Sequence, residues 1–300
     1  MTFNSSKYVT ATLDSIAAQD YEGPLELIVS DDGSTDNTIA VCNAWAKEHR
    51  ERFTTIKVLQ TPHNLGICGN YNFALEHVTG EWVKYLAGDD ILTEEALSTY
   101  IRAARETGDK AFCCGVETFN DDPTLTVDKH TYGVRYAMKD ELDSDDTSEQ
   151  YHNIVFPSKG SSLVEGPTLF IHTASLRRLG GMDMTYPMLE DYPFAVRWLR
   201  AGNHLGVIKI PLVKYRVYSE SVSQKHSKDY FREMYYTALY DARIRYSLDK
   251  HRYIDAYNWK CMREILRHDY PGLKNRLIKS FFILTNIKAV LAKLPGHRPQ

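Results

Sequence analysis

Three pairs of acidic residues stand where they could do chemistry. Asp31-Asp32 and Asp89-Asp90 each follow a short apolar run, and Glu190-Asp191 precedes a segment with helical spacing. Carboxylates that follow buried strands can accept hydrogen bonds from a base or a ribose, and they bind hard cations such as Mg²⁺ and Mn²⁺. A carboxylate at the start of a helix can act as a general base toward a hydroxyl. These residue types suit a site for a nucleotide, a divalent metal and an acceptor alcohol.

Each pair also has a purely structural interpretation. The sequence Asp31-Asp32-Gly33-Ser34 is typical of a tight turn. Asp89-Asp90 could belong to a capped turn before the segment that begins at Thr93. Glu190-Asp191 could serve only to complement a helix dipole. Taken singly, no pair decides between structure and chemistry.

The alternation of short apolar runs with helical segments predicts how these residues are positioned. Strands are predicted at 25–30, 56–59, 82–86 and 111–117, and helices at 5–19, 36–50, 67–77 and 93–106. This order predicts an α/β fold with a mostly parallel central sheet and helices on both faces. Ligands bind beyond the carboxyl ends of the strands in such sheets, where the first two acidic turns would lie.

The second half of the chain is less regular. Residues 119–159 are mostly polar, and we expect a variable insertion with too few apolar residues to be fixed to a core. Beyond Ser227 the spacing predicts helices, which would form a C-terminal appendage. The predicted domains are therefore residues 1–223 and 224–300.

Composition and charge narrow the class of protein. The net charge of -3 over 300 residues gives no global attraction to nucleic acid. Five cysteines lack the spacing of a zinc site and fit a reducing compartment, and no apolar run could cross a bilayer. We therefore predict a cytoplasmic protein. The basic segment 274–293 has an apolar face, which could contact a membrane peripherally or pack against the body or a second subunit of a homodimer.

The order of the short motifs resembles that of the inverting family 2 glycosyltransferases with the GT-A fold, from Met1 to about Ser223. The matching motifs include Met1-Thr2-Phe3-Asn4, Val29 to Asp36, Asn64-x-Gly66, Asp89-Asp90, Gly166-Pro167-Thr168, Gly180 to Asp183, Leu189 to Tyr192 and Tyr215-Arg216-Val217. The resemblance implies transfer of a sugar from a nucleoside-diphosphate sugar, with a UDP-sugar favoured, to a glycan or lipid-linked acceptor. It also implies a divalent metal, Mn or Mg, and a role in cell-surface polysaccharide assembly.

The resemblance also implies a role for particular residues. Asp90 would ligate the metal, Asp191 would be the catalytic base, and Glu190 would lie beside it on the acceptor side. The other implied site residues are Thr2, Asn4, Asp31, Asp32 and Asp89 for the nucleotide sugar, and Gly166, Pro167 and Thr168 for the acceptor side. Within the first set, Asp32 would recognise the base and Asp89 the ribose.

Three features depart from the family pattern. Ala87 stands where the family usually has a further Asp, and Tyr218 stands where many members have a His. The family's first strand lies directly before the residues that match Met1 to Asn4, so we expect a start upstream of Met1 or a weakened form. These departures keep open a non-catalytic sugar-nucleotide-binding protein. A sugar-1-phosphate nucleotidyltransferase is the other alternative, but no Gly-rich basic phosphate loop stands near the start.

Overall fold

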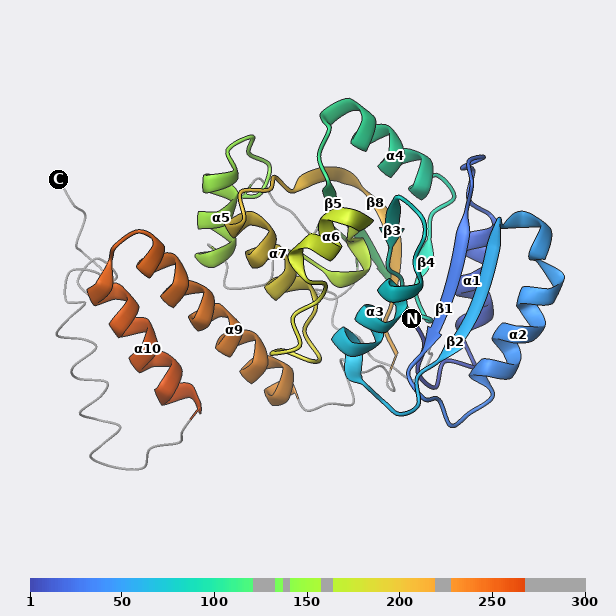
Figure 1. The fold of residues 1–300 in the computed structure, drawn as a ribbon, viewed down its shortest axis with the longest axis horizontal. Helices are drawn as coiled ribbons and strands as arrows, with labels where there is room; N and C mark the ends of the chain where they lie inside the picture. The colour runs from blue at the N-terminus through green and yellow to red at the C-terminus, as the bar shows by residue number, and fades with distance from the viewer. Residues whose placement is uncertain (121–132, 137–140, 158–163, 219–227, 268–300) are drawn as a thin grey trace. The chain divides into compact units, whose positions relative to one another are not determined.

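The computed structural model describes residues 1–120, 133–136, 141–157, 164–218 and 228–267. It divides into two compact units, Met1–His226 and Ser227–Gln300, and every predicted site residue lies in the first (Figure 1). In the second unit, α9 (Lys228–Asp249) and α10 (Tyr253–Arg267) pack against each other. These two helices confirm the helical C-terminal appendage. The segment 274–293, predicted to contact a membrane or a protein surface, lies outside the described residues.

A two-stranded sheet forms the N-terminal part of the first unit. Strands β1 (Glu26–Asp31) and β2 (Thr55–Gln60) run parallel, and their neighbours are α1 (Val9–Ala17), α2 (Thr38–Glu48) and α3 (Gly66–His77). Leu27 and Val29 are buried against α1 and α2. Because side chains alternate along a strand, Ser30 points to the other face, where its hydroxyl donates to Asn70 of α3 at 2.6 Å. Helices therefore cover both faces of this sheet, as Figure 1 shows.

The second sheet has six strands, and the sequence did not predict its pairing. Its order is β3 (Trp82–Lys84), β7 (Phe170–His172), β5 (Ala111–Phe119), β8 (Gly206–Arg216) and β4 (Ile91–Leu92), with β6 (Gly133–Tyr136) also paired to β5. Only β5 and β8 pair in parallel, and the other pairs are antiparallel. The expected α/β class is confirmed, but the expectation of a mostly parallel sheet is wrong for this part. The reason is that β7, which comes late in the chain, inserts between β3 and β5.

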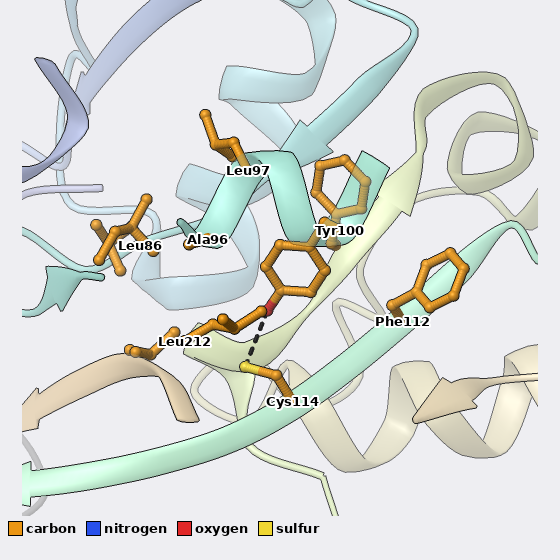
Figure 2. Packing of buried hydrophobic residues seen from close by; sticks show 10 residues of the cluster. Leu86, Ala96, Leu97, Tyr100, Phe112, Cys114 and Leu212 are labelled. Carbon is orange, nitrogen blue, oxygen red and sulfur yellow. Dashed lines mark hydrogen bonds between the residues drawn. The ribbon is translucent and has the colours of Figure 1, made fainter. Parts of the chain in front are cut away.

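One aromatic cluster holds α4 (Ala96–Thr107) to this second sheet. Tyr100 of α4 is fully buried among Leu86, Phe112 and Leu212, and its hydroxyl oxygen lies 3.0 Å from Cys114 Sγ (Figure 2). Tyr100 also stacks on Phe170, with ring centroids 4.7 Å apart. Burial of such large apolar side chains is the main stabilising contribution to this layer.

Further short elements complete the first unit. They are η1 (Arg50–Arg52), α5 (Thr147–Val155), η2 (Gly166–Thr168), α6 (Thr173–Leu179) and α7 (Asp191–Arg200). The helix α5 corrects the expectation that residues 119–159 cannot join a core, because Ile154 and Val155 are fully buried. Asp146 caps it by accepting the Ser148 N–H at 2.8 Å. Across the described residues, no helix is both long and apolar enough to pass through a membrane.

A groove separates the two sheets. It has a volume of about 570 Å³, and its walls include Leu27 and Val29 of β1 and Trp82 and Val83 of β3. At one end, Thr2 pairs in parallel with Asp31, and the Met1 amino group donates to Leu86 O at 2.8 Å. Apart from Thr2, this edge of β1 has no strand partner among the described residues. The groove therefore lies where one further strand could pair with β1, and apolar side chains line it.

We predict that an apolar strand attached before Met1 fills this groove. Since Thr2 pairs with Asp31, about four residues before Met1 would reach the level of Glu26. A version extended by Val-Ile-Val-Ile should raise Tm by at least ~5 °C and tighten sugar-nucleotide binding. Differential scanning fluorimetry and calorimetric titration measure both quantities.

The control is an extension of equal length with two prolines, which cannot donate hydrogen bonds to a strand. If both extensions leave Tm and affinity unchanged, the groove does not accept a strand. The Val-Ile extension alone should change them.

Candidate active site

Asp31 organises the turn at the end of β1. It is fully buried, and Oδ2 accepts from Thr2 Oγ1 at 3.0 Å while Oδ1 accepts from Ser34 N at 2.8 Å. Asn4 reaches the same turn, since its side-chain oxygen accepts the Thr35 N–H at 2.9 Å. Gly33 has a φ of +77°, which a side chain would strain, so the turn requires glycine there. Thr2, Asn4 and Asp31 thus form one connected group.

Asp32 ties this turn to the start of α3. Its Oδ1 accepts the Leu65 N–H at 2.7 Å, and its Oδ2 accepts the Gly66 N–H at 3.0 Å. Thr61 also donates to Oδ1 at 3.2 Å. Such bonds stabilise the carboxylate and position its remaining lone pairs. Asp32 therefore has the structural role that its turn predicts. This role does not prevent the same carboxylate from contacting a ligand.

Asp89 and Asp90 meet the end of β8. Asp90 Oδ1 accepts the Arg216 N–H at 3.0 Å, and Asp89 Oδ2 accepts from the Tyr218 hydroxyl at 2.9 Å. The Arg216 guanidinium donates to Asp89 O at 2.8 Å and lies between the rings of Tyr8 and Phe119. Tyr218 therefore holds Asp89 by a hydrogen bond.

The two acidic turns lie against each other through Gly88. A Cβ at this position would be 2.7 Å from Thr2 Cγ2, which is closer than atoms can pack, and 3.2 Å from Met1 O, which is tighter than most such contacts. Thr2 in turn bonds to Asp31. The first and second acidic pairs, about sixty residues apart in sequence, are therefore brought together by one contact between a glycine and a threonine.

Asp90 has the features of a partial metal site. It is 1% exposed, and among the described residues its Oδ2 has no hydrogen-bond partner. No described group of three or more His, Cys, Asp and Glu side chains could hold a metal ion. Mg²⁺ and Mn²⁺ commonly bind through one or two carboxylates together with substrate phosphates. Asp90, with Asp89 beside it, fits a metal that a diphosphate helps to hold.

The third group lies at the start of α7. Gly166 faces Glu190 so closely that a Cβ there would be 1.9 Å from Glu190 Oε1. The Asp191 carboxylate accepts the Tyr192 N–H at 2.6 Å, and the Gly166 N–H lies close enough to it to lower its pKa. The turn η2 and the start of α7, which the sequence predicts on the acceptor side, thus form one unit.

Burial separates the proton affinities of the two carboxyls on α7. It raises the pKa of Asp191 to about 6, an increase that bonds from Tyr192 N–H and Gly166 N–H limit. Burial and the charge of Asp191 together raise the pKa of Glu190 to about 8. Near neutral pH, Asp191 is therefore ionised and Glu190 carries a proton. Burial also raises the pKa of Asp89 and Asp90, and the charge of Asp89 adds to the effect on Asp90.

Sequence reasoning missed two residues between these groups. Tyr71 of α3 is 5% exposed, and burial is the main cause that raises the pKa of its phenol. The charges of Asp90, Glu190 and Asp191 raise this pKa further. Lys84 of β3 donates to Pro167 O. Both lie within apolar patterns typical of a core. The pairing of β3 with β7 places Lys84 beside the site, and the bond from Cys68 N–H to Pro187 O ties α3, which carries Tyr71, to the segment before α7.

We predict that Gly88→Ala lowers the free energy of unfolding by ~1–3 kcal/mol, because the new methyl group must push Thr2 away from Asp31. Urea denaturation measures this change. Gly80→Ala is a matched control, since a Cβ there would meet its nearest neighbour at an ordinary 3.4 Å. Equal unfolding free energies for the two variants would show that the close approach is not a constraint.

Comparison with known proteins places the chain in a family. The model of glycosyl transferase family 2 matches residues 1–164, more than half of the chain, so the chain belongs to this family. An uncharacterised glycosyltransferase of Rickettsia typhi is 24% identical over 67% of this chain and 57% of its own length. The poly(ribitol-phosphate) β-N-acetylglucosaminyltransferase TarS of Staphylococcus aureus is 37% identical over 32% of this chain and 16% of its own length. The aligned regions thus span less than two thirds of these relatives.

Solved structures confirm the GT-A fold. TarS residues 1–349 in complex with UDP-GlcNAc superpose with a TM-score of 0.61 at 19% identity, over 97% of this chain and 81% of that one. The mannosyltransferase PcManGT of Pyrobaculum calidifontis, in complex with GDP-Man and Mn²⁺, gives a TM-score of 0.53 at 17% identity, over 98% and 79%. At these identities the likeness defines the fold, and the predicted family and fold class are confirmed.

Proposed function

We propose that the protein is an inverting glycosyltransferase that moves a sugar from a nucleoside-diphosphate sugar to an acceptor hydroxyl. The observation that carries this proposal is that the first two acidic pairs, which are distant in sequence, lie against each other through Gly88 and Thr2. Tyr71 lies near both the second and the third group, since the charges of Asp90, Glu190 and Asp191 all raise the pKa of its phenol. Family membership and the GT-A fold support the same reaction class.

In the proposed reaction, Asp191 acts as the general base. An acceptor hydroxyl oxygen attacks the anomeric carbon and forms the new glycosidic bond, while the bond from that carbon to the diphosphate oxygen breaks. Asp191 takes the hydroxyl proton, and the nucleoside diphosphate leaves from the opposite face, so the configuration inverts. Glu190, which is protonated near neutral pH, can donate a hydrogen bond to the acceptor instead of competing for its proton.

The donor side is held by the first two acidic groups. Asp32 would recognise the base, Asp31 with Thr2 and Asn4 would support that pocket, and Asp89 would contact the ribose. A divalent metal bound at Asp90 supplies positive charge that stabilises the departing diphosphate. The unpartnered Oδ2 of Asp90 supports this assignment, and the Mn²⁺ in the PcManGT complex is consistent with it.

A UDP-sugar is the favoured donor, because the TarS complex contains UDP-GlcNAc. The proposed acceptor is a glycan or a lipid-linked glycan in polysaccharide assembly, and the name of TarS, a poly(ribitol-phosphate) β-N-acetylglucosaminyltransferase, is consistent with a polymeric acceptor. Gly166, Pro167 and Thr168 would line the acceptor side. A screen of UDP- and GDP-sugars with Mn²⁺, scored by thermal shift and by diphosphate release, tests the proposal. If sugar nucleotides bind but no nucleoside diphosphate is released from any donor, even when a panel of acceptors is present, the protein is a sugar-nucleotide-binding protein instead.

We predict opposite outcomes for the two neighbouring carboxyls. Asp191→Asn removes the base and should lower kcat by at least ~10²-fold. Glu190→Gln imitates the protonated side chain, so kcat should stay within ~3-fold of the wild-type value at pH 7. Steady-state transfer assays on both variants, checked for folding by circular dichroism, measure these rates. Undiminished transfer by a folded Asp191→Asn protein would rule out its role.

We predict that kcat/KM falls as pH drops through about 6. Asp191 must be ionised to accept a proton, and its raised pKa means that it is protonated below that pH. The rate should fall ~10-fold per pH unit there and should rise to a plateau on the alkaline side. A profile of kcat/KM from pH 5 to 8 measures this acidic fall, and Glu190→Gln should leave the pH of its midpoint unchanged. A profile that is flat from pH 5 to 7 contradicts the assignment.

We predict that Asp90→Asn raises the Mn²⁺ concentration for half-maximal transfer by at least ~10-fold. Asn keeps an oxygen that can accept the Arg216 N–H, so the fold is retained while the negative charge is lost. Metal titrations of transfer activity measure the shift. The exposed residue Asp20 offers a control, and Asp20→Asn should titrate like the wild type.

A further inference from the structure

Lys84 occupies an unusual position for a lysine. It ends β3, pairs with Phe170 of β7, and its amino group lies 5.9 Å from the centroid of the Tyr100 ring. Burial lowers the pKa of this amine to about 8, an effect that the charges of Cys114 and Asp90 oppose. Placing an ammonium group in such surroundings costs free energy unless it makes compensating bonds. The bonds that it makes therefore indicate its role.

Lys84 and Tyr100 together hold the turn η2 from one side. The Lys84 ammonium donates to Pro167 O, and it also donates to Tyr85 O at 2.8 Å. The Tyr100 hydroxyl donates to the next carbonyl of the turn, Thr168 O, at 2.6 Å. Two side chains from β3 and α4 thus bind successive carbonyl oxygens. Bonds from a charged donor are stronger than neutral ones, so the larger share of the restraint falls to Lys84.

The other end of the same turn contacts the proposed base. Gly166 Cα lies directly against the Glu190 carboxyl, and the Gly166 N–H lies close enough to Asp191 to lower the pKa of its carboxyl. A displacement of the turn would therefore disturb the start of α7, where Glu190 and Asp191 lie. Misplacement of a catalytic group by about 1 Å can lower a rate ~10²-fold.

We propose that Lys84 is a positioning residue that holds the turn Gly166–Thr168 so that Asp191 is aligned with the acceptor hydroxyl. This inference rests on the proposed function for its kinetic consequence. The contacts that carry it, from Lys84 to Pro167 and from Gly166 to Asp191, belong to described residues of one compact unit. Lys84 touches no reacting atom in this proposal, and it acts only through the turn.

Lys84→Met keeps the length and apolar stem of the side chain and removes the ammonium group. We expect kcat to fall at least ~10-fold while the donor KM stays within ~3-fold, because the donor pocket does not include the turn. Lys110→Met is the matched control, since Lys110 is exposed and lies over the Trp82 ring of the same strand without bonding to the turn. It should behave like the wild type.

Tyr100→Phe provides a second variant, which keeps the ring in the core and deletes the bond to Thr168 O. If both residues act on one turn, the double variant should lose less than the product of the single losses. Lys84→Arg, which restores a charged donor, should recover part of kcat. If Lys84→Met fails to fold, Tyr100→Phe and the Arg variant still test the role.

Hydrogen exchange separates this inference from the proposed function. The amides of Gly166 and Leu169 should exchange at least ~10-fold faster in Lys84→Met than in Lys110→Met, whether or not the protein transfers sugar. Wild-type protein that transfers no sugar would overturn the function alone. A folded Lys84→Met protein with unchanged turn exchange would overturn the positioning role, and so would unchanged kcat in a transferring enzyme.

Discussion

The first unit depends on a short stretch of backbone at Met1 and Thr2. Thr2 N–H donates to Ser30 O at 2.9 Å, Asp32 N–H donates to Thr2 O at 2.8 Å, and the Met1 amino group reaches Leu86 O beyond the end of β3. These bonds link the two sheets at the level where both acidic turns begin. Elsewhere the sheets face each other across the apolar groove. The relative placement of Asp31 and Asp89 therefore rests on these two residues together with bonds from α1 to the β4 region, such as Leu92 N–H to Ser15 Oγ at 3.1 Å.

The site combines several buried carboxylates, and their oxygens are satisfied to different degrees. Asp31 and Asp32 accept several N–H and O–H bonds. Asp90 accepts one such bond at Oδ1, and its Oδ2 has no hydrogen-bond partner among the described residues. Burial therefore outweighs the hydrogen bond and raises the pKa of Asp90. Hydrogen-bond donors of the protein thus satisfy Asp31 and Asp32, which take no part in proton transfer in the proposed reaction. Asp90 Oδ2, which has no hydrogen-bond partner among the described residues, is the oxygen that a cation could use.

Much of this arrangement could be predicted from sequence, because it depends on local patterns. Apolar runs followed by Asp placed β1 and the loop after β3 correctly, and the alternation gave the helices α1 to α4 within a few residues. The order of motifs also identified the family. Asp191 was predicted at a helix start, and it is the first residue of α7.

The rest depends on contacts between distant segments, which local patterns do not encode. The insertion of β7 beside β3 made the sheet mixed, and it also brought Lys84 to Pro167. Helix α5 joined the core because Ile154 and Val155 fall on one side of a mostly polar segment, too few to give a periodic signal. Tyr71 was not predicted as a site residue because its apolar pattern is strong, and an aromatic residue in such a helical pattern usually indicates packing.

The free edge of β1 has a consequence for handling the protein. Over most of its length, this edge has no strand partner among the described residues, and apolar side chains line the groove beside it. Unpaired strand edges next to apolar surface are templates for pairing with another chain. In a form that begins at Met1 this edge would be open to sheet-edge association, so concentrated solutions of that form should lose monomer, and a soluble peptide of strand-forming sequence should slow that loss.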